Sequence, residues 1–244
     1  MSVSNAALEH NHSSSDDNHH HHHHSIDDCP CTLVKQPDLH DKEATARWMV
    51  HSLDWGVLST ISSRFTDHHP VPFGNIYSFV DGTCDNSTGI PYIYGTYMDQ
   101  SFQDSLSNTA VSFTLSEASL ASVCYSGGAG GSNLLPACKI SRNGYGDPEN
   151  PPCARLTLTG ILTVVAESKN KDMEDEIHSE FDFAQKALFQ RHFAMEEWPR
   201  NHKWVIAKIE IQDIWLIDYF GGASILNVEK YKSVDLTPSP DADE

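Results

Sequence analysis

The alternation of apolar and polar residues in ARLTLTGILTVV (154–165) restricts the possible folds of this chain more than any other feature. In an extended strand, successive side chains point to opposite faces. One face therefore carries the apolar residues Leu156, Leu158, Leu162 and Val164. The other face carries three threonines. A strand with one apolar face needs a core on that side and neighbouring strands along its edges, so the chain must contain a sheet.

Five further segments have the character of strands. We predict strands at 57–62, 74–82, 90–98, 110–118 and 202–220. Turn-forming residues separate the earlier strands, a pattern typical of a β-meander or barrel. Segment 202–220 is expected to supply the last strands, with a bend near Gln212-Asp213. An alternation of strands with helices is absent from the pattern, which excludes a dinucleotide-binding role for Gly221-Gly222 in IWLIDYFGG (214–222).

Helical periodicity is weaker and more local. Helices are predicted at 41–53 and 171–191, with a short helix or turn at 101–108 and at 226–231. In the longest helix, one apolar stripe is expected to pack against the barrel and contains Met173, Ile177, Phe181, Ala184 and Leu188. In the first helix, Trp48 and Met49 are expected in the core.

The predicted fold class is mostly β with helices (α+β), an antiparallel barrel in which residues 29–232 form a single domain. Residues 119–152 have no clear periodicity. Their SGGAGGS segment (126–132) lacks the Lys-Ser/Thr ending of a phosphate-binding loop, so we expect a surface loop.

The two ends of the chain differ in composition from this domain. Residues 1–28 are polar and low in complexity and include a run of six histidines, His19 to His24. We interpret this segment as a purification tag or a disordered tract, with a native metal-binding tract as the alternative. Residues 233–244 are predicted to be a disordered acidic tail. The chain as given shows no apolar signal-peptide core and no apolar run long enough to cross a membrane.

The charge balance limits the possible partners. The chain has 34 Asp and Glu against 16 Lys and Arg, a formal net charge of -18. A surface this acidic repels nucleic-acid phosphates and anionic membranes. We therefore expect neither a nucleic-acid partner nor membrane insertion.

Cysteines and glycosylation sequons point to an oxidising compartment. The six cysteines lack the paired spacing of a zinc site and are compatible with disulfides: Cys29, Cys31, Cys84, Cys124, Cys138 and Cys153. Two sequons begin at Asn11 and Asn86, the latter in DGTCDNSTGIP (81–91), which we expect to be an exposed loop. Together these features favour a secreted or lumenal protein.

Three segments and their order in the chain carry a resemblance to a known family: ARWMVHSLDWGVLSTIS (46–62), PYIYGTYMDQSFQDSLSN (91–108) and LFQRHFAMEEWPRNHKWVIAKIEIQDIWLIDYFGG (188–222). Over roughly residues 40 to 232, the chain resembles the CREG family of secreted glycoproteins. The resemblance implies a split β-barrel like that of pyridoxamine-phosphate oxidase and other FMN-binding proteins, and a homodimer.

The same resemblance implies secretion or an endosomal or lysosomal location, a role in growth, differentiation or lysosomal function, and a cell-surface or sorting receptor as partner. It also implies that Gly221-Gly222 forms the tight turn after the final barrel strand. A disulfide between Cys138 and Cys153 is implied too, whereas the pairing of the other four cysteines stays open, Cys84 with Cys124 being one possibility.

The resemblance also allows a test for a flavin site. In the oxidase branch of this fold, a Ser-Arg-Lys run grips the FMN phosphate; alignment on Asn108 places Asp99, Gln100 and Ser101 at those positions. No Lys or Arg occurs between Arg64 and Lys139. Because phosphate is normally held by such cations, we expect a vestigial site without a cofactor. The remaining candidate donors to a phosphate are His68 or His69, and Arg142 or Arg191 from later segments.

No other catalytic motif is present, so we assign no catalytic residue and no metal site. His192, Glu196 and His202 have spacing too loose to predict a metal centre. A binding glycoprotein is thus the leading hypothesis. An FMN-dependent oxidoreductase of the same fold is the alternative, and a haem-binding relative that uses His192 or His202 is a third possibility.

Overall fold

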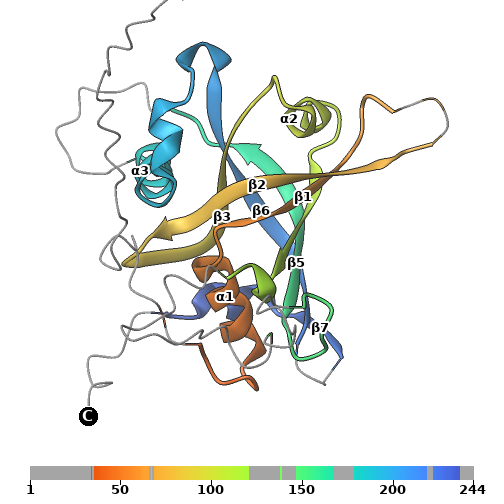
Figure 1. Ribbon diagram of the computed structural model, residues 1–244, viewed down its shortest axis with the longest axis vertical. Helices are drawn as coiled ribbons and strands as arrows, with labels where there is room; N and C mark the ends of the chain where they lie inside the picture. Colours follow the sequence, from red (N-terminus) through yellow and green to blue (C-terminus); the bar gives the residue numbers. More distant parts are fainter. Residues whose placement is uncertain are drawn as a thin grey trace, which may run out of the picture.

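The protein contains an antiparallel barrel with an extra strand at one end (Figure 1). The computed structural model describes residues 34, 36–65, 67, 69–120, 138, 147–167, 179–218 and 222–236. Within these ranges seven strands follow the order β3-β2-β1-β4-β5-β6-β7, and a further pairing of β3 with β6 closes the first six into a barrel. The predicted antiparallel split barrel is therefore confirmed.

The strands match the predicted segments with local differences. They are β1 (Trp55–Ile61), β2 (Pro72–Thr83), β3 (Asn86–Thr96), β4 (Ala110–Ser116), β5 (Arg155–Val164), β6 (Trp204–Ile217) and β7 (Ala223–Leu226). The segment expected to be an exposed loop, 81–91, is instead a hairpin whose turn is Cys84-Asp85. Thr83 pairs directly with Asn86, which leaves the sequon asparagine exposed at the hairpin end.

The helices are α1 (Lys42–Ser52), α2 (Gln100–Ser105), α3 (Glu180–Arg191) and α4 (Val228–Ser233), with short 3-10 turns η2 (Glu117–Ser119), η4 (Phe193–Glu197) and η5 (Arg200–His202). Helix α3 begins at Glu180 and not at residue 171, because the Ser179 hydroxyl caps it by accepting a hydrogen bond from the Asp182 amide. Of its predicted apolar stripe, Ala184 and Leu188 are buried. Residues 173 and 177 lie outside the described ranges.

Two apolar clusters hold these elements together. One fills the barrel and includes Trp48, Met49, Leu156 and Leu158. The other lies outside the barrel wall, where α3 packs on β2, β3 and β6. The prediction that Val164 shares the buried face is wrong, since this residue is 41% exposed. At the end of β5 the chain turns toward α3, and the next residue, Val165, is buried in the second cluster instead.

A β-bulge bends β6 at the position predicted from the sequence. Thr159 pairs with Asp213 and Gly160 with Ile211, so Gln212 is the extra residue. A Cβ at Gly160 would lie 2.1 Å from the Glu210 carbonyl oxygen, which explains the glycine. On either side of the bulge, the first half of β6 pairs with β3 and the second half pairs with β7.

Several sequence predictions lie outside the described ranges: those on residues 1–28, with Asn11 and the histidine run, on Cys29, Cys31, Cys124 and Arg142, on the 126–132 segment and on the end of the acidic tail. Gly221 also lies outside them, whereas Gly222 adopts a positive φ of 75° before β7. In the part of the chain that the structure describes, no helix is long and apolar enough to span a membrane.

Candidate functional site

The position of the predicted phosphate site is the start of α2, where Asp99 is the N-cap residue. Its carboxylate accepts hydrogen bonds from the Ser101 amide (2.9 Å), from Asn75 Nδ2 (3.1 Å) and from the Tyr77 hydroxyl. Strand β2 thus presents two neutral donors to the helix start. Burial and the neighbouring Asp99 raise the pKa of Tyr77, so its hydroxyl stays a donor.

The other two positions of the predicted phosphate site also face the protein. Gln100 Nε2 donates to Asp104 Oδ1 at 2.7 Å and to Ser63 Oγ at 3.2 Å. Ser101 is fully buried, and its hydroxyl has no hydrogen-bond partner among the described residues. The donors that would have to reach a phosphate are thus committed to the protein or enclosed by it.

A second carboxylate, which sequence reasoning missed, lies in the same helix. Asp104 is fully buried and accepts hydrogen bonds from Thr60 Oγ1 (2.6 Å) and from the Ser63 amide (2.7 Å) and hydroxyl (2.8 Å). Burial raises the pKa of Asp104, but these hydrogen bonds and the one from Gln100 outweigh burial and lower the pKa. Among the described residues, neither Asp99 nor Asp104 forms an ion pair with Lys or Arg.

The start of α2, where the family resemblance led us to look for phosphate-binding cations, instead carries two carboxylates held by neutral donors. The negative charge of Asp99 and Asp104 would repel a phosphate dianion placed there. The residues at the start of α2 do not fit an FMN phosphate.

The histidines considered for a metal or haem are not brought together. His192 is half-buried after α3, where its Nε2 lies 3.0 Å from the Phe79 carbonyl oxygen and burial lowers its pKa. The His202 ring lies 5.5 Å from the Trp204 ring between centroids, tilted by 40° to it. Among the described residues, the one close group of three metal-ligand types is Glu117, Cys138 and Cys153, in which the two cysteines are already bonded to each other.

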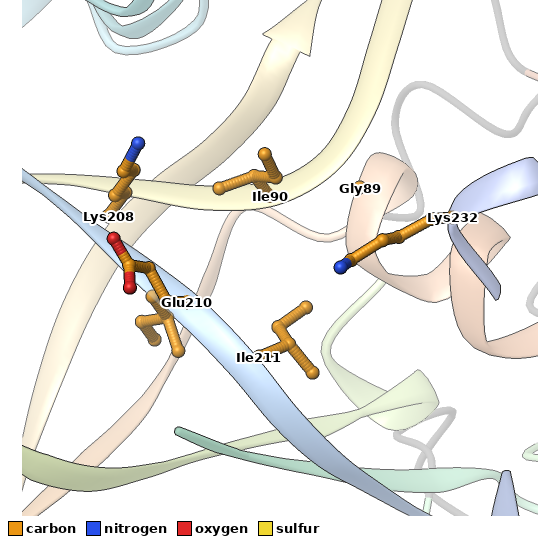
Figure 2. A pocket seen from close by; sticks show the side chains of 7 residues that line it. Gly89, Ile90, Lys208, Glu210, Ile211 and Lys232 are labelled. Carbon is orange, nitrogen blue, oxygen red and sulfur yellow. The ribbon is translucent and has the colours of Figure 1, made fainter. Parts of the chain in front are cut away.

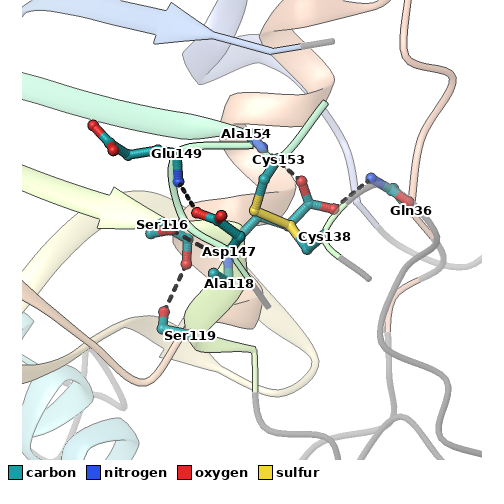
Figure 3. The surroundings of a disulfide bond; sticks show 10 residues. Gln36, Ser116, Ala118, Ser119, Cys138, Asp147, Glu149, Cys153 and Ala154 are labelled. Atoms are coloured by element: carbon teal, nitrogen blue, oxygen red, sulfur yellow. Dashed lines mark hydrogen bonds between the residues drawn. A yellow bond between two sulfur atoms is a disulfide. The ribbon is translucent and has the colours of Figure 1, made fainter. Parts of the chain in front are cut away.

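The Cys138–Cys153 disulfide, which the family resemblance implied, is buried beside Glu117 (Figure 3). The Glu117 carboxylate accepts hydrogen bonds from the Ala154 amide (2.8 Å) and from Gln36 Nε2 (3.2 Å). Burial raises the pKa of Glu117. Cys84, in the β2–β3 turn, is disulfide-bonded as well.

The segment 188–222, one of those that carry the family resemblance, contributes Trp198 and Trp204 to an aromatic cluster on the outer wall of the barrel. Trp204 of β6 stacks on Tyr94 of β3 at 5.1 Å and contacts Trp198 at 4.8 Å, and its indole N–H donates to the Pro199 carbonyl at 2.9 Å. The cluster covers the seam where β3 and β6 close the barrel.

A buried charged network ties α1 to the β2–β3 hairpin and was also missed. Asp81 is fully buried and accepts hydrogen bonds from His51 Nδ1 (2.7 Å), the Ser87 hydroxyl (2.5 Å) and the Gly89 amide (3.1 Å). Arg47 Nε lies 4.0 Å from the same carboxylate. Burial raises the pKa of Asp81, but His51 and Ser87 outweigh burial and lower it.

The outer face of the sheet carries a continuous row of side chains across six strands. Register places the following residues side by side from β2 to β7: Ile76, Val57, Thr114, Thr157, Trp215 and Ile225. Ile76 is 64% and Ile225 74% exposed, and Trp215 is 36% exposed. The two threonine hydroxyls lie 3.1 Å apart and form a hydrogen bond with each other. The other four residues are apolar, so the cross-strand row is largely apolar. It is a candidate interface.

Comparison with solved structures supports the fold. A structure described as a heme binding protein from Mycobacterium smegmatis superposes with a TM-score of 0.52 at 14% identity, covering 82% of this chain and 62% of that one. Campylobacter jejuni ChuZ superposes with a TM-score of 0.50 at 11% identity, covering 85% and 67%. At these identities the likeness concerns the fold alone.

Comparison with known sequences is more specific. The chain is 36% identical to Protein CREG1 of Gallus gallus over 200 residues, which is 81% of this chain and 88% of that protein. It is 35% identical to Protein CREG2 of Homo sapiens over 190 residues, 78% of this chain and 55% of that protein, and 32% identical to human Protein CREG1 over 198 residues, 81% and 76%. The family model described as CREG, beta-barrel matches residues 37–233. The chain belongs to the CREG family.

Proposed function

We propose that this protein is a secreted or endosomal–lysosomal glycoprotein that acts by binding other proteins, in control of growth and differentiation or in lysosomal function, without a flavin. The observation that carries the proposal is the pair of carboxylates at the start of α2, Asp99 and Asp104, each held by neutral donors. A flavin phosphate would need charge-assisted donors at this place.

The sequence around this site supports the same conclusion. Between Arg64 and Lys139 the chain has no Lys or Arg, and this stretch supplies β2, β3, α2 and β4. The positive end of a helix dipole can hold an anion, but α2 is only six residues long and its N-terminus is already capped by Asp99.

The direct test is an absorbance spectrum. The purified protein is incubated with FMN, desalted and measured between 300 and 550 nm, beside a flavoprotein treated in the same way. We expect no retained flavin band. A retained band in stoichiometric amount would favour the alternative, an FMN-dependent oxidoreductase.

The alternative functions need donors from elsewhere. An FMN enzyme would have to recruit cations from later residues such as Arg142, from Arg191 or from a second subunit. Among the described residues, Arg191 Nη1 is bonded to the His51 carbonyl at 2.7 Å. The structural neighbour from Mycobacterium smegmatis is described as a heme binding protein, but in this chain the candidate ligand His192 has its Nε2 against the Phe79 carbonyl oxygen.

A homodimer is the second part of the proposal. The exposed cross-strand row from Ile76 to Ile225 supports it, because an apolar band of this length on an antiparallel sheet favours a symmetric partner. Asn86 is exposed at the end of the β2–β3 hairpin and is the proposed glycan site. A cell-surface or sorting receptor is the proposed further partner.

A further inference from the structure

The barrel does not close along its whole length. Strands β3 and β6 pair only where Tyr92–Thr96 faces Trp204–Lys208. Beyond Tyr92 the two strands separate, since β3 continues with β2 while β6 continues with β5. The β3–β6 hollow between them has a volume of about 330 Å³ and is lined by Gly89, Ile90, Lys208, Ile209, Glu210, Ile211 and Lys232 (Figure 2). This volume is at the lower end of small-molecule sites, roughly 300–1,000 Å³.

The hollow lies at the other end of β3 from the vestigial flavin site. Gly89 and Ile90 are near the start of β3, whereas Asp99 and α2 follow its last residue, Thr96. Any ligand of the hollow is therefore bound separately from the flavin position.

The polar backbone groups of Gly89 in the wall of the hollow already have hydrogen-bond partners within the protein. Ile90 and Ile211 line the hollow from opposite strands, β3 and β6 (Figure 2). The Gly89 amide donates to Asp81 at 3.1 Å, and its carbonyl accepts from the Tyr231 hydroxyl at 2.6 Å. A Cβ at Gly89 would lie 2.6 Å from the Arg47 guanidinium, so only the glycine backbone fits at this point of the wall. Such walls suit an apolar body.

The charges at the rim are not equivalent. Lys208 Nζ is held by both oxygens of Glu180, at 2.9 and 2.8 Å. The amino group of Lys232 points toward the space between Ile90 and Ile211 (Figure 2). Among the described residues its partner is Glu229 at 3.2 Å, whose side chain is 83% exposed, and such a surface pair contributes little to stability. Lys232 is thus the cation available to a ligand.

Glu210 limits the charge that a ligand can carry and the orientation in which it can bind. Its carboxylate lies at the end of the hollow away from Lys232 (Figure 2). A dianion such as a phosphate ester would be repelled by Glu210, whereas a single negative charge at the other end would lie beside Lys232 with its apolar part toward the isoleucines.

We propose that the β3–β6 hollow is a binding site for a small amphipathic monoanion, an alkyl or aryl carboxylate whose charged group pairs with Lys232 and whose apolar body contacts Ile90 and Ile211. The proposal is independent of the binding function proposed above. It adds a small-molecule site to a domain whose flavin position is vestigial.

Octanoate is a suitable probe, with n-octanol as its neutral counterpart. Sodium octanoate is titrated into the ¹⁵N-labelled full chain, and amide signals are followed by NMR. The matched variants are K232Q, which removes the cation, and K230Q, which removes an exposed charge of the same helix outside the hollow. A third variant, I211W, fills the space, and its fold is checked from the dispersion of the same spectrum.

We expect saturable shifts of the Gly89 and Ile211 amide signals in the parent and in K230Q, and affinity about fivefold weaker in K232Q, the loss expected for a partly exposed ion pair. n-Octanol should bind more weakly than octanoate, and a folded I211W should not bind. Absence of saturable binding, shifts confined to other parts of the barrel, or equal affinities of the parent and K232Q would overturn the proposal. Because K232Q changes a surface side chain, its result does not depend on I211W folding.

Discussion

At the scale of single residues, four carboxylates are held by hydrogen bonds within the fold. Asp81, Asp104 and Glu117 are buried, and Asp99 is half-buried. In the sequence each stands among ordinary turn or helix residues, and no local pattern marks its hydrogen-bond partners. The identity of Asp99 was predicted to matter, but its partners Asn75 and Tyr77 come from a different strand. Periodicity cannot indicate such a contact.

Glu117 gives a prediction on pH. Its pKa in the folded protein is raised above the ordinary value of 4.5. The folded state therefore holds this proton at pH values where the unfolded chain has lost it, so this contribution to stability is gained as pH falls and lost as pH rises through the raised pKa. When the pH is lowered from 7 to 5, the melting temperature of the parent should rise relative to that of E117Q. A difference that is constant over this range, or of opposite direction, would contradict the assignment.

At the scale of elements, the attachment of α1 to the β2–β3 hairpin depends on one buried acid. Removing Asp81 would leave the buried Arg47 without its counter-charge and the buried His51 Nδ1 without its hydrogen-bond partner. We expect D81A to lower the free energy of unfolding by roughly 3 kcal/mol or more. Asp85, exposed in the turn of the same hairpin, is the matched control. D85A should change the free energy of unfolding by less than about 0.5 kcal/mol.

Urea unfolding followed by circular dichroism gives both values. Equal effects of D81A and D85A would show that the network does not anchor the hairpin.

The elements that the sequence predicted well are those with a strong internal period. The β5 alternation and the bend in β6 were both predicted. The bend was predictable because the polar pair Gln212-Asp213 interrupts the alternation of apolar residues in this segment. Two features were missed. The hairpin at 81–91 was expected to be a loop, since turn-forming residues there outweighed the strand signal. Strand β7 has only four residues and depends on pairing with β6.

At the scale of the whole molecule, the cross-strand row predicts how two copies meet. A charge at Trp215 or Ile225 would have to be buried without a partner in an interface through this face. We expect W215E and I225E to be monomeric by sedimentation velocity while the parent is dimeric. F193E, which places a charge on an exposed side chain of η4 outside the row, should stay dimeric. A dimer that tolerates both row variants would exclude this face as the interface.

The central claim is that the barrel has no working flavin-phosphate site, and the most direct measurement is an FMN titration at low ionic strength. Electrostatic attraction is least screened under these conditions, so even a weak phosphate site would be detected. Flavin fluorescence anisotropy is recorded against increasing protein up to the millimolar range. The carboxylates at Asp99 and Asp104 predict no saturable rise. A saturable rise that added salt weakens would mean that cations do reach the phosphate, and would contradict the account.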